Sequence, residues 1–138
     1  IIAFISVIVF SFIIKLTIVS FFYIIIFTLL GSFILGAVGF IAGLWAEKFD
    51  HMASVTNFLI VPLSFLSGTF YSIDRLPSVL YTISKLNPFF YMIDGFRYGF
   101  IGQSDGSVIY GIIYLTILSF ITWFIAYLLY KKGYKIKF

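Results

Sequence analysis

The sequence has no cysteine, a single histidine and few charged residues. The lack of cysteine excludes a disulfide framework and thiolate chemistry, and one histidine cannot form a multi-histidine metal site. Only 10% of the 138 residues are charged, whereas 62% are hydrophobic. A soluble domain of this size needs far more charge to cover its surface. The composition therefore indicates a multi-span membrane protein, and the fold class that we expect is all-α.

The small net charge of +4 is concentrated at the C-terminus, where four lysines occur in the last eight residues, KKGYKIKF. This pattern is typical of a membrane-facing tail rather than of a nucleic-acid surface. By the positive-inside rule, the tail predicts a cytoplasmic C-terminus in a multi-pass protein.

Long uncharged runs predict the membrane spans. They lie at about 1–14, 18–45, 52–71 and 107–130. The first run reaches only ~21 Å as a helix, short of the ~30 Å hydrocarbon core. The chain does not begin with Met, and no charged signal region precedes this run. We therefore expect one N-terminally truncated transmembrane domain over 1–138, a bundle of about four spans.

The stretch 76–102 is too broken to span the membrane, because Pro77 and Pro88 divide it into two short segments. Asn87 suits the cap and Pro88 the first position of the second helix. Asp94 and Arg97, three residues apart, can pair on one helix face. These features predict a short re-entrant helical hairpin on the external side.

Four small residues of the second span share one helix face, because they follow one another at steps of four, three and four: Ser32, Gly36, Gly39 and Gly43. Small faces let helix backbones approach closely in lipid. The stripe therefore predicts close helix packing, either within the chain, which we favour, or in a dimer.

Two further polar groups each allow two interpretations. The first lies between two spans and is either a solvated turn or a docking surface for a cytoplasmic partner: Glu47, Lys48, Asp50 and His51. The second follows Pro62, whose ring tends to kink a helix. The hydroxyl groups of Ser64, Ser67 and Thr69 either donate hydrogen bonds that satisfy the carbonyls freed by the proline, or face a polar pathway.

Two segments together resemble a known family. They are GLWAEKFDHMASVTNFLIVPLSFLSGTFYSIDRLP and, further on, LNPFFYMIDGFRYGFIG. The chain resembles, over nearly all of its length, the permease subunit of type-2 ATP-binding cassette (ABC) exporters, in the branch with nodulation-factor, polysaccharide and drug-export permeases. Such permeases typically have six spans, of which this chain would hold about the last four.

The resemblance implies half of a transporter in the inner membrane, with a second permease subunit as partner, as a homodimer. It implies a separate ABC ATP-binding subunit, since the chain has no Walker A loop and needs no cofactor of its own. The group Glu47–His51 would then contact the ATPase, and the external hairpin, with Asn87, Pro88, Asp94 and Arg97, would form a gate. The translocation path would be lined by Phe58, Pro62, Ser64, Ser67, Gly68 and Tyr71. Amphiphilic, glycan-linked or drug-like cargo suits the aromatic-rich walls.

Other classes of membrane protein remain as alternatives. An intramembrane enzyme needs a nucleophile with a base, or metal ligands, within the membrane. His51 and Asp94 are predicted on opposite sides, and neither H-E-x-x-H nor G-x-S-x-G occurs. A channel would place polar residues along several spans. We therefore predict a transport subunit without an ATPase site, with a non-ABC membrane subunit, a channel or an enzyme as the alternative.

Overall fold

The computed structural model describes Ile5, residues 18–69, Ile73 and residues 76–133, which fold as helices and turns without a strand. Most of the predicted first span, Tyr71 and the end of the C-terminal tail lie outside these residues. The helices are α2 (Phe21–Trp45), α3 (Phe49–Val55), the π-helix η1 (Thr56–Ile60), α4 (Val61–Phe65), α5 (Ser78–Leu86), α6 (Pro88–Ile101) and α7 (Val108–Lys131).

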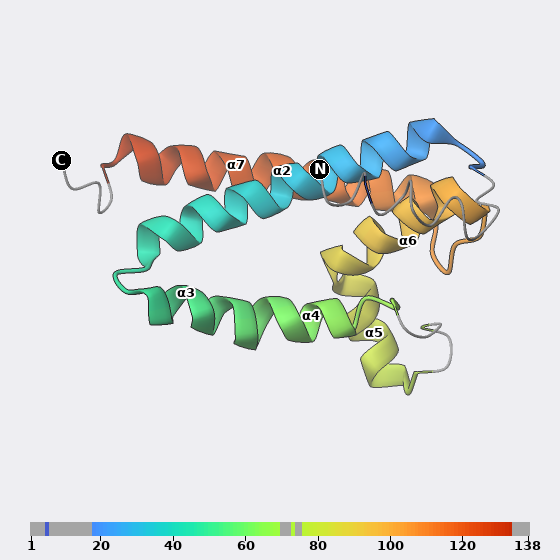
Figure 1. Ribbon diagram of the computed structural model, residues 1–138, viewed down its shortest axis with the longest axis horizontal. Coiled ribbons are helices and arrows are strands. Elements are labelled where there is room, and N and C mark those ends of the chain that lie inside the picture. The colour runs from blue at the N-terminus through green and yellow to red at the C-terminus, as the bar shows by residue number, and fades with distance from the viewer. Residues whose placement is uncertain (1–4, 6–17, 70–72, 74–75, 134–138) are drawn as a thin grey trace.

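Helices α2 and α7 lie side by side and run in the same direction (Figure 1). They have 25 and 24 residues, a length of roughly 36 Å at 1.5 Å per residue, enough to cross a ~30 Å hydrocarbon core. In their most apolar 18-residue windows, only 22% and 17% of the residues are buried. The core helix of a soluble protein would be mostly buried, so these exposed apolar faces indicate contact with lipid.

Helices α3, η1 and α4 form one continuous run, here called the arm, which runs in the opposite direction to α2 and contacts it near the α2–α3 turn (Figure 1). The backbone stays helical at both junctions, Thr56 and Val61. In η1 the N–H of Val61 donates to the carbonyl of Thr56, five residues back, as a π turn requires. This wide turn directly precedes Pro62, which has no N–H to donate. The helical part of the predicted span 52–71 thus begins at Phe49 and ends at Phe65.

Helix α6 lies against both α2 and α7 at the opposite end from the α2–α3 turn (Figure 1). The N–H groups of Val19 and Ser20 donate to the carbonyl of Gly99 at 3.0 and 2.9 Å, which joins the start of α2 to α6. The core of the described residues gathers at this end: Phe27, Ile34, Ile73, Phe90, Tyr91, Met92 and Leu115. We give the name hairpin core to α6, the α6–α7 loop (102–107) and the parts of α2 and α7 that pack on them. These parts include Phe27, Ile34 and Leu115.

The small-residue stripe of α2 faces away from the hairpin core. Ser32, Gly36, Gly39 and Gly43 are all exposed, whereas Phe27, Gly31, Ile34, Ala37 and Ala42 are buried on the other side of the helix. A Cβ atom added to any of the last three stripe residues would meet nothing within 4 Å. None of the described helices packs on this stripe, so its packing, within the chain or in a dimer, stays a prediction.

Candidate functional site

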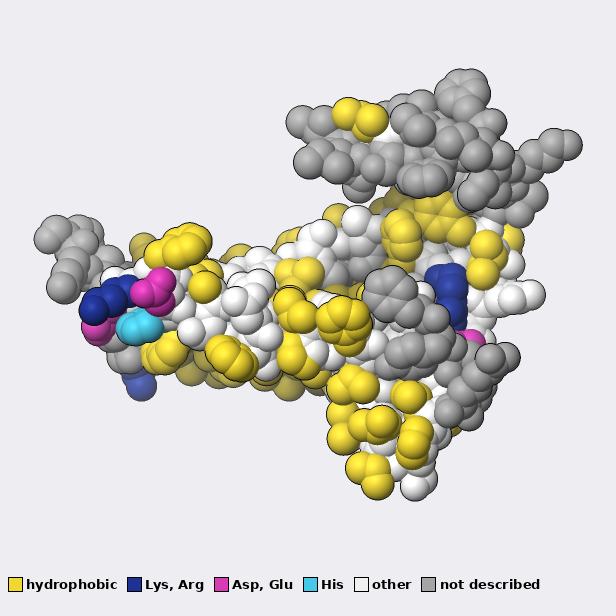
Figure 2. Space-filling model, turned by 60° about the horizontal axis from the view of Figure 1, so that its bottom comes forward, with side chains coloured by type: hydrophobic (Ala, Val, Ile, Leu, Met, Phe, Trp, Pro, Cys, Tyr) yellow, Lys and Arg dark blue, Asp and Glu magenta, His cyan; other side chains and the backbone are white. Residues whose placement is uncertain are grey.

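Charged side chains gather at two ends of the molecule, and the surface between them is apolar or uncharged (Figure 2). One end holds the α2–α3 turn together with the end of α7, where Lys131 and Lys132 lie (Figure 1). The other end holds the ion pairs of α6 and the α6–α7 loop. This separation suits a protein whose two ends meet water on opposite sides of a bilayer.

The α2–α3 turn is compact and polar. The N–H of Glu47 donates to Nδ1 of His51 at 3.3 Å, and the rings of Trp45 and His51 lie 5.4 Å apart. His51 thus closes the turn, while Glu47, Lys48 and Asp50 are exposed. Asp50 lies in the first turn of α3, where the helix dipole favours a negative charge. The turn therefore presents an ordered polar surface between two long helices.

The hydroxyl groups near Pro62 bond to their own helix. Ser64 Oγ donates to the carbonyl of Ile60 at 2.8 Å, and Ser67 Oγ donates to that of Ser64 at 2.5 Å. Ser67 Oγ also lies 2.7 Å from Thr69 Oγ1. These bonds favour the interpretation that the hydroxyls repair the end of the helix.

The residues expected along a pathway divide between two environments. Phe58 is 83% exposed and Pro62 is exposed as well. Ser67 and Gly68 are buried, and Gly68 takes the left-handed conformation with φ of 75°. Any path along the arm would therefore pass over the face that holds Phe58 and Pro62, with Gly68 shaping the turn beyond it.

Asn87 has two partners in different helices. Its side-chain oxygen accepts the N–H of Phe89 at 3.0 Å, which caps α6 as predicted, and Pro88 takes the first helical position. Its Nδ2 donates to the carbonyl of Leu63 at 2.6 Å. That carbonyl is left free where α4 ends, because the N–H of Ser67 turns to Ser64 instead. Asn87 therefore links the arm to the hairpin core, a contact that the sequence did not predict.

Asp94 is the buried centre of the α6–α7 loop, with a side chain that is 4% exposed. Its Oδ1 accepts from Arg97 Nη2 at 2.6 Å and from the N–H of Asp105 at 2.8 Å. Its Oδ2 accepts the N–H of Gly106 at 3.0 Å. A buried carboxylate is tolerated when its oxygens are bonded in this way. Asp94 thus fixes the loop that leads into α7.

Arg97 bridges two carboxylates, because it also lies 3.1 Å from Oδ2 of Asp105. Burial alone would lower the pKa of Arg97, but the hydrogen bonds and negative charges of Asp105 and Asp94 outweigh burial and raise this pKa. The pairing of Asp94 with Arg97 was expected, but the role of Asp105 and Gly106 was not. The one available signal was the turn-forming sequence Ser104–Ser107 directly before the last span.

His51 and Asp94, the residues considered above for an intramembrane enzyme, do not meet. His51 lies in the α2–α3 turn and Asp94 lies at the other end of the molecule (Figure 1). Among the described residues, no group of three or more His, Asp or Glu side chains could hold a metal ion. The arrangement of these residues offers polar surfaces and ion pairs rather than a nucleophile with a base.

Comparison with known proteins identifies the family of the chain. The family of ABC-2 type transporters matches residues 1–101, from the start of the chain to the end of α6. The chain belongs to the ABC-2 type transporter family. It is similar to the inner membrane transport permease YadH of Escherichia coli K12, with 38% identity over 97 residues. The permease of the same name in Shigella flexneri matches to the same extent.

The match covers 69% of this chain and 37% of the length of YadH. The chain thus spans well under half of the curated relatives that it matches. No solved structure matches the chain significantly. Family membership, the apolar helices and the inner membrane relatives identify this ABC-2 family member as a membrane protein of the transport-permease type.

Proposed function

We propose that the chain is the membrane part of an ATP-driven exporter and works with a separate ABC ATP-binding subunit. The observation that carries this proposal is the ordered polar turn of Glu47, Lys48 and Asp50, which joins α2 to the arm. It lies at the same end as Lys131 and Lys132 (Figure 1), and basic residues favour the cytoplasmic side. An ATPase docked there would contact both helices at once.

The arm is suited to transmit movement of the ATPase. Among the described helices outside the arm, it contacts α2 near the polar turn and α6 at its far end. The far end is tied by Asn87 to the carbonyl of Leu63. A push at Asp50 would therefore tilt the arm while the hairpin core holds its far end. Such a tilt biases two states of the permease, which coupling to ATP requires.

A second permease subunit would complete the translocation path. The exposed stripe of Ser32, Gly36, Gly39 and Gly43 lets another helix approach closely in lipid. The exposed face of the arm at Phe58 and Pro62 would line the path. Two copies of this chain would thus enclose a route for amphiphilic, glycan-linked or drug-like cargo, and the external gate of this route would lie where the moving arm meets the fixed hairpin core.

The coupling can be tested in the full-length permease, purified with its cassette ATPase in lipid. Glu47→Ala and Asp50→Lys should impair transport and the stimulation of ATP hydrolysis, while membrane insertion stays intact. Thr82→Ala, an exposed change at the opposite end, is the matched control. If the wild-type permease neither binds the ATPase subunit nor changes its rate, the proposed function fails.

The orientation of the chain in the membrane can be tested by labelling single cysteines, introduced into a permease that has no other cysteine. Single cysteines at Asp50 and Lys132 should be protected from an impermeant thiol reagent on whole cells, whereas one at Thr82 should react. Thr82 is exposed, and the neighbouring Ser84 is fully buried and would report burial rather than sidedness. If the cysteine at position 50 reacted and the cysteine at position 82 were protected, the orientation in the membrane would be the reverse of the proposed one.

A further inference from the structure

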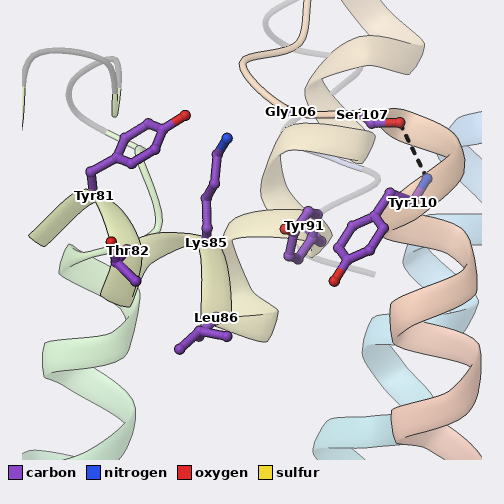
Figure 3. Close-up of a pocket in the computed structure, with 8 residues that line it drawn as sticks. All are labelled: Tyr81, Thr82, Lys85, Leu86, Tyr91, Gly106, Ser107 and Tyr110. Atoms are coloured by element: carbon purple, nitrogen blue, oxygen red, sulfur yellow. Dashed lines mark hydrogen bonds between the residues drawn. The ribbon is translucent and has the colours of Figure 1, made fainter. Parts of the chain in front are cut away.

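A cavity of about 410 Å³ opens between α5, α6 and the start of α7. Tyrosine and lysine side chains from these helices line it (Figure 3). Its walls include Tyr81, Lys85, Tyr91, Ser107 and Tyr110. None of the residues that line it is acidic. The cavity therefore combines aromatic walls with a single positive charge.

Lys85 is a cation that no described acidic residue neutralises. Its Nζ lies 4.5 Å from the centre of the Tyr81 ring. The ion pairs of the described residues join Arg97 to Asp94 and Asp105 instead. The ammonium group rises between Tyr81 and the Tyr91–Tyr110 side (Figure 3). An anion that entered the cavity would thus meet the positive charge of Lys85.

Tyrosine rings and hydroxyls form the other wall. The ring of Tyr91 lies 5.5 Å from that of Tyr110 and 5.1 Å from that of Tyr114. Tyr114 donates its hydroxyl to the carbonyl of Leu86 at 2.7 Å, which fixes this cluster against α5. Burial, and then the neighbouring Tyr110, raise the pKa of Tyr91 to about 12. Like any tyrosine, whose ordinary pKa is about 10, Tyr91 is protonated at neutral pH and can donate a hydrogen bond.

Exposed apolar residues of α7 follow Tyr110, which lines the cavity. Tyr110 lies in the first turn of α7, and Ile113 and Ile117 follow at helical spacing. These two isoleucines are 54% and 55% exposed, and Leu86 beside the cavity is 69% exposed. Tyrosine and lysine side chains near the end of a span sit at the level of lipid headgroups. Acyl chains could therefore lie along α7 below a headgroup held at Lys85.

We propose that this cavity binds the phosphate-bearing headgroup of an anionic membrane lipid, with Lys85 as its charge partner and the tyrosines as its walls. The inference needs the chain to lie in a membrane but does not depend on the ATPase or on export. A bound lipid would brace α5 against the start of α7.

The test uses the full-length permease in bilayer nanodiscs with photoactivatable lipids, followed by mapping of the crosslinked peptides. Phosphatidylglycerol should crosslink to the segment 81–110 in preference to phosphatidylcholine. Lys85→Gln should lower that preference roughly fivefold, as expected for one lysine at an anionic surface, and Lys85→Arg should restore it. Lys132→Gln, at the other end of α7, should leave crosslinks to this segment unchanged.

Three results would overturn the inference. One is equal crosslinking of both lipids to the segment 81–110, and another is an unchanged preference in Lys85→Gln. The third is Lys85-dependent binding of inorganic phosphate in detergent without any preference for phosphatidylglycerol in bilayers, which would show an anion site rather than a lipid site. All three are independent of transport, so they leave the exporter proposal to its own test.

Discussion

The arm and α6 each contain a proline, Pro62 and Pro88, but they differ in how they are held. None of the residues of α3, η1 and α4 is buried. Helix α6 buries Phe90, Tyr91, Met92, Asp94, Gly95 and Gly99 against α2 and α7. Helix α6 is therefore held by its contacts with other helices, whereas the arm is held mainly by hydrogen bonds within its own helix.

This difference has a functional meaning in a transporter. Segments with few buried contacts open at low free energy, whereas a packed core resists opening. The hairpin core, centred on Asp94, is suited to stay fixed while the arm moves. Asn87, which bonds to Leu63 in the arm and caps α6, is the joint between them.

The largest expected effect comes from removing the centre of the hairpin core. Asp94→Ala should lower the free energy of unfolding by about 3–5 kcal/mol, because it removes the acceptor of two loop N–H groups and one of the two carboxylates that Arg97 contacts. Denaturation in mixed detergent micelles measures this loss. Asp50→Ala in the arm, an exposed acidic residue, should change stability by no more than about 0.5 kcal/mol.

A double-mutant cycle sharpens this prediction. Asp94→Ala and Arg97→Ala should be coupled by about 0.5–3 kcal/mol, more than a typical exposed pair. Simple additivity of the two changes would show that the ion pair does not hold the loop.

Glycine substitutions give the next largest contrast. A Cβ on Gly99 would lie 2.5 Å from Ile24 Cγ1 and 3.0 Å from its backbone nitrogen, so Gly99→Ala should cost about 1–3 kcal/mol. The same change at Gly39 meets nothing within 4 Å and should leave the isolated subunit as stable or up to about 1 kcal/mol more stable. Thermal unfolding of both variants compares them. Equal losses at both positions would contradict the outward placement of the stripe.

A smaller loss of stability than at Asp94 is expected at the joint. Asn87→Ser keeps a good helix cap but is too short to bond to Leu63, and should cost about 1 kcal/mol. Asn87→Ala removes the cap as well and should cost about 1 kcal/mol more. Transport should fall in both variants, since both release the arm. Full transport in Asn87→Ser would show that this bond does not couple the arm to the hairpin core.

Much of the local structure could be predicted from the sequence, because its signals act over short distances. Asn87 and Pro88 start α6, Gly102 ends it with φ of 71°, and Asp94 pairs with Arg97 one turn later. Each of these rests on helix geometry and capping within one segment. The apolar lengths of α2 and α7 were predictable for the same reason.

The contacts between segments could not be predicted. Asp105 and Gly106 reach Asp94 through backbone N–H groups, which every non-proline residue has, so no side chain signals them. The leucine that accepts from Asn87 is likewise unremarkable in sequence. Apolar residues at helical spacing in α6, namely Phe89, Ile93, Phe96 and Phe100, give no guide to burial either. None of them is buried and Phe96 is 39% exposed, while Asp94 is buried. In lipid an apolar face needs no protein partner, so hydrophobicity alone does not locate the core.

Distances between spin labels can show directly whether the arm moves against a fixed hairpin core. Spin labels at Ser54 in α3 and Lys132 after α7 report the arm, and labels at Phe22 and Gln103 report the hairpin core; all four side chains are exposed. In the full-length permease with its ATPase, binding of ATP should change the Ser54–Lys132 distance distribution measured by pulsed electron paramagnetic resonance. The Phe22–Gln103 distribution should stay the same. Equal shifts in both pairs, or no shift in either during ATP-dependent transport, would contradict the account.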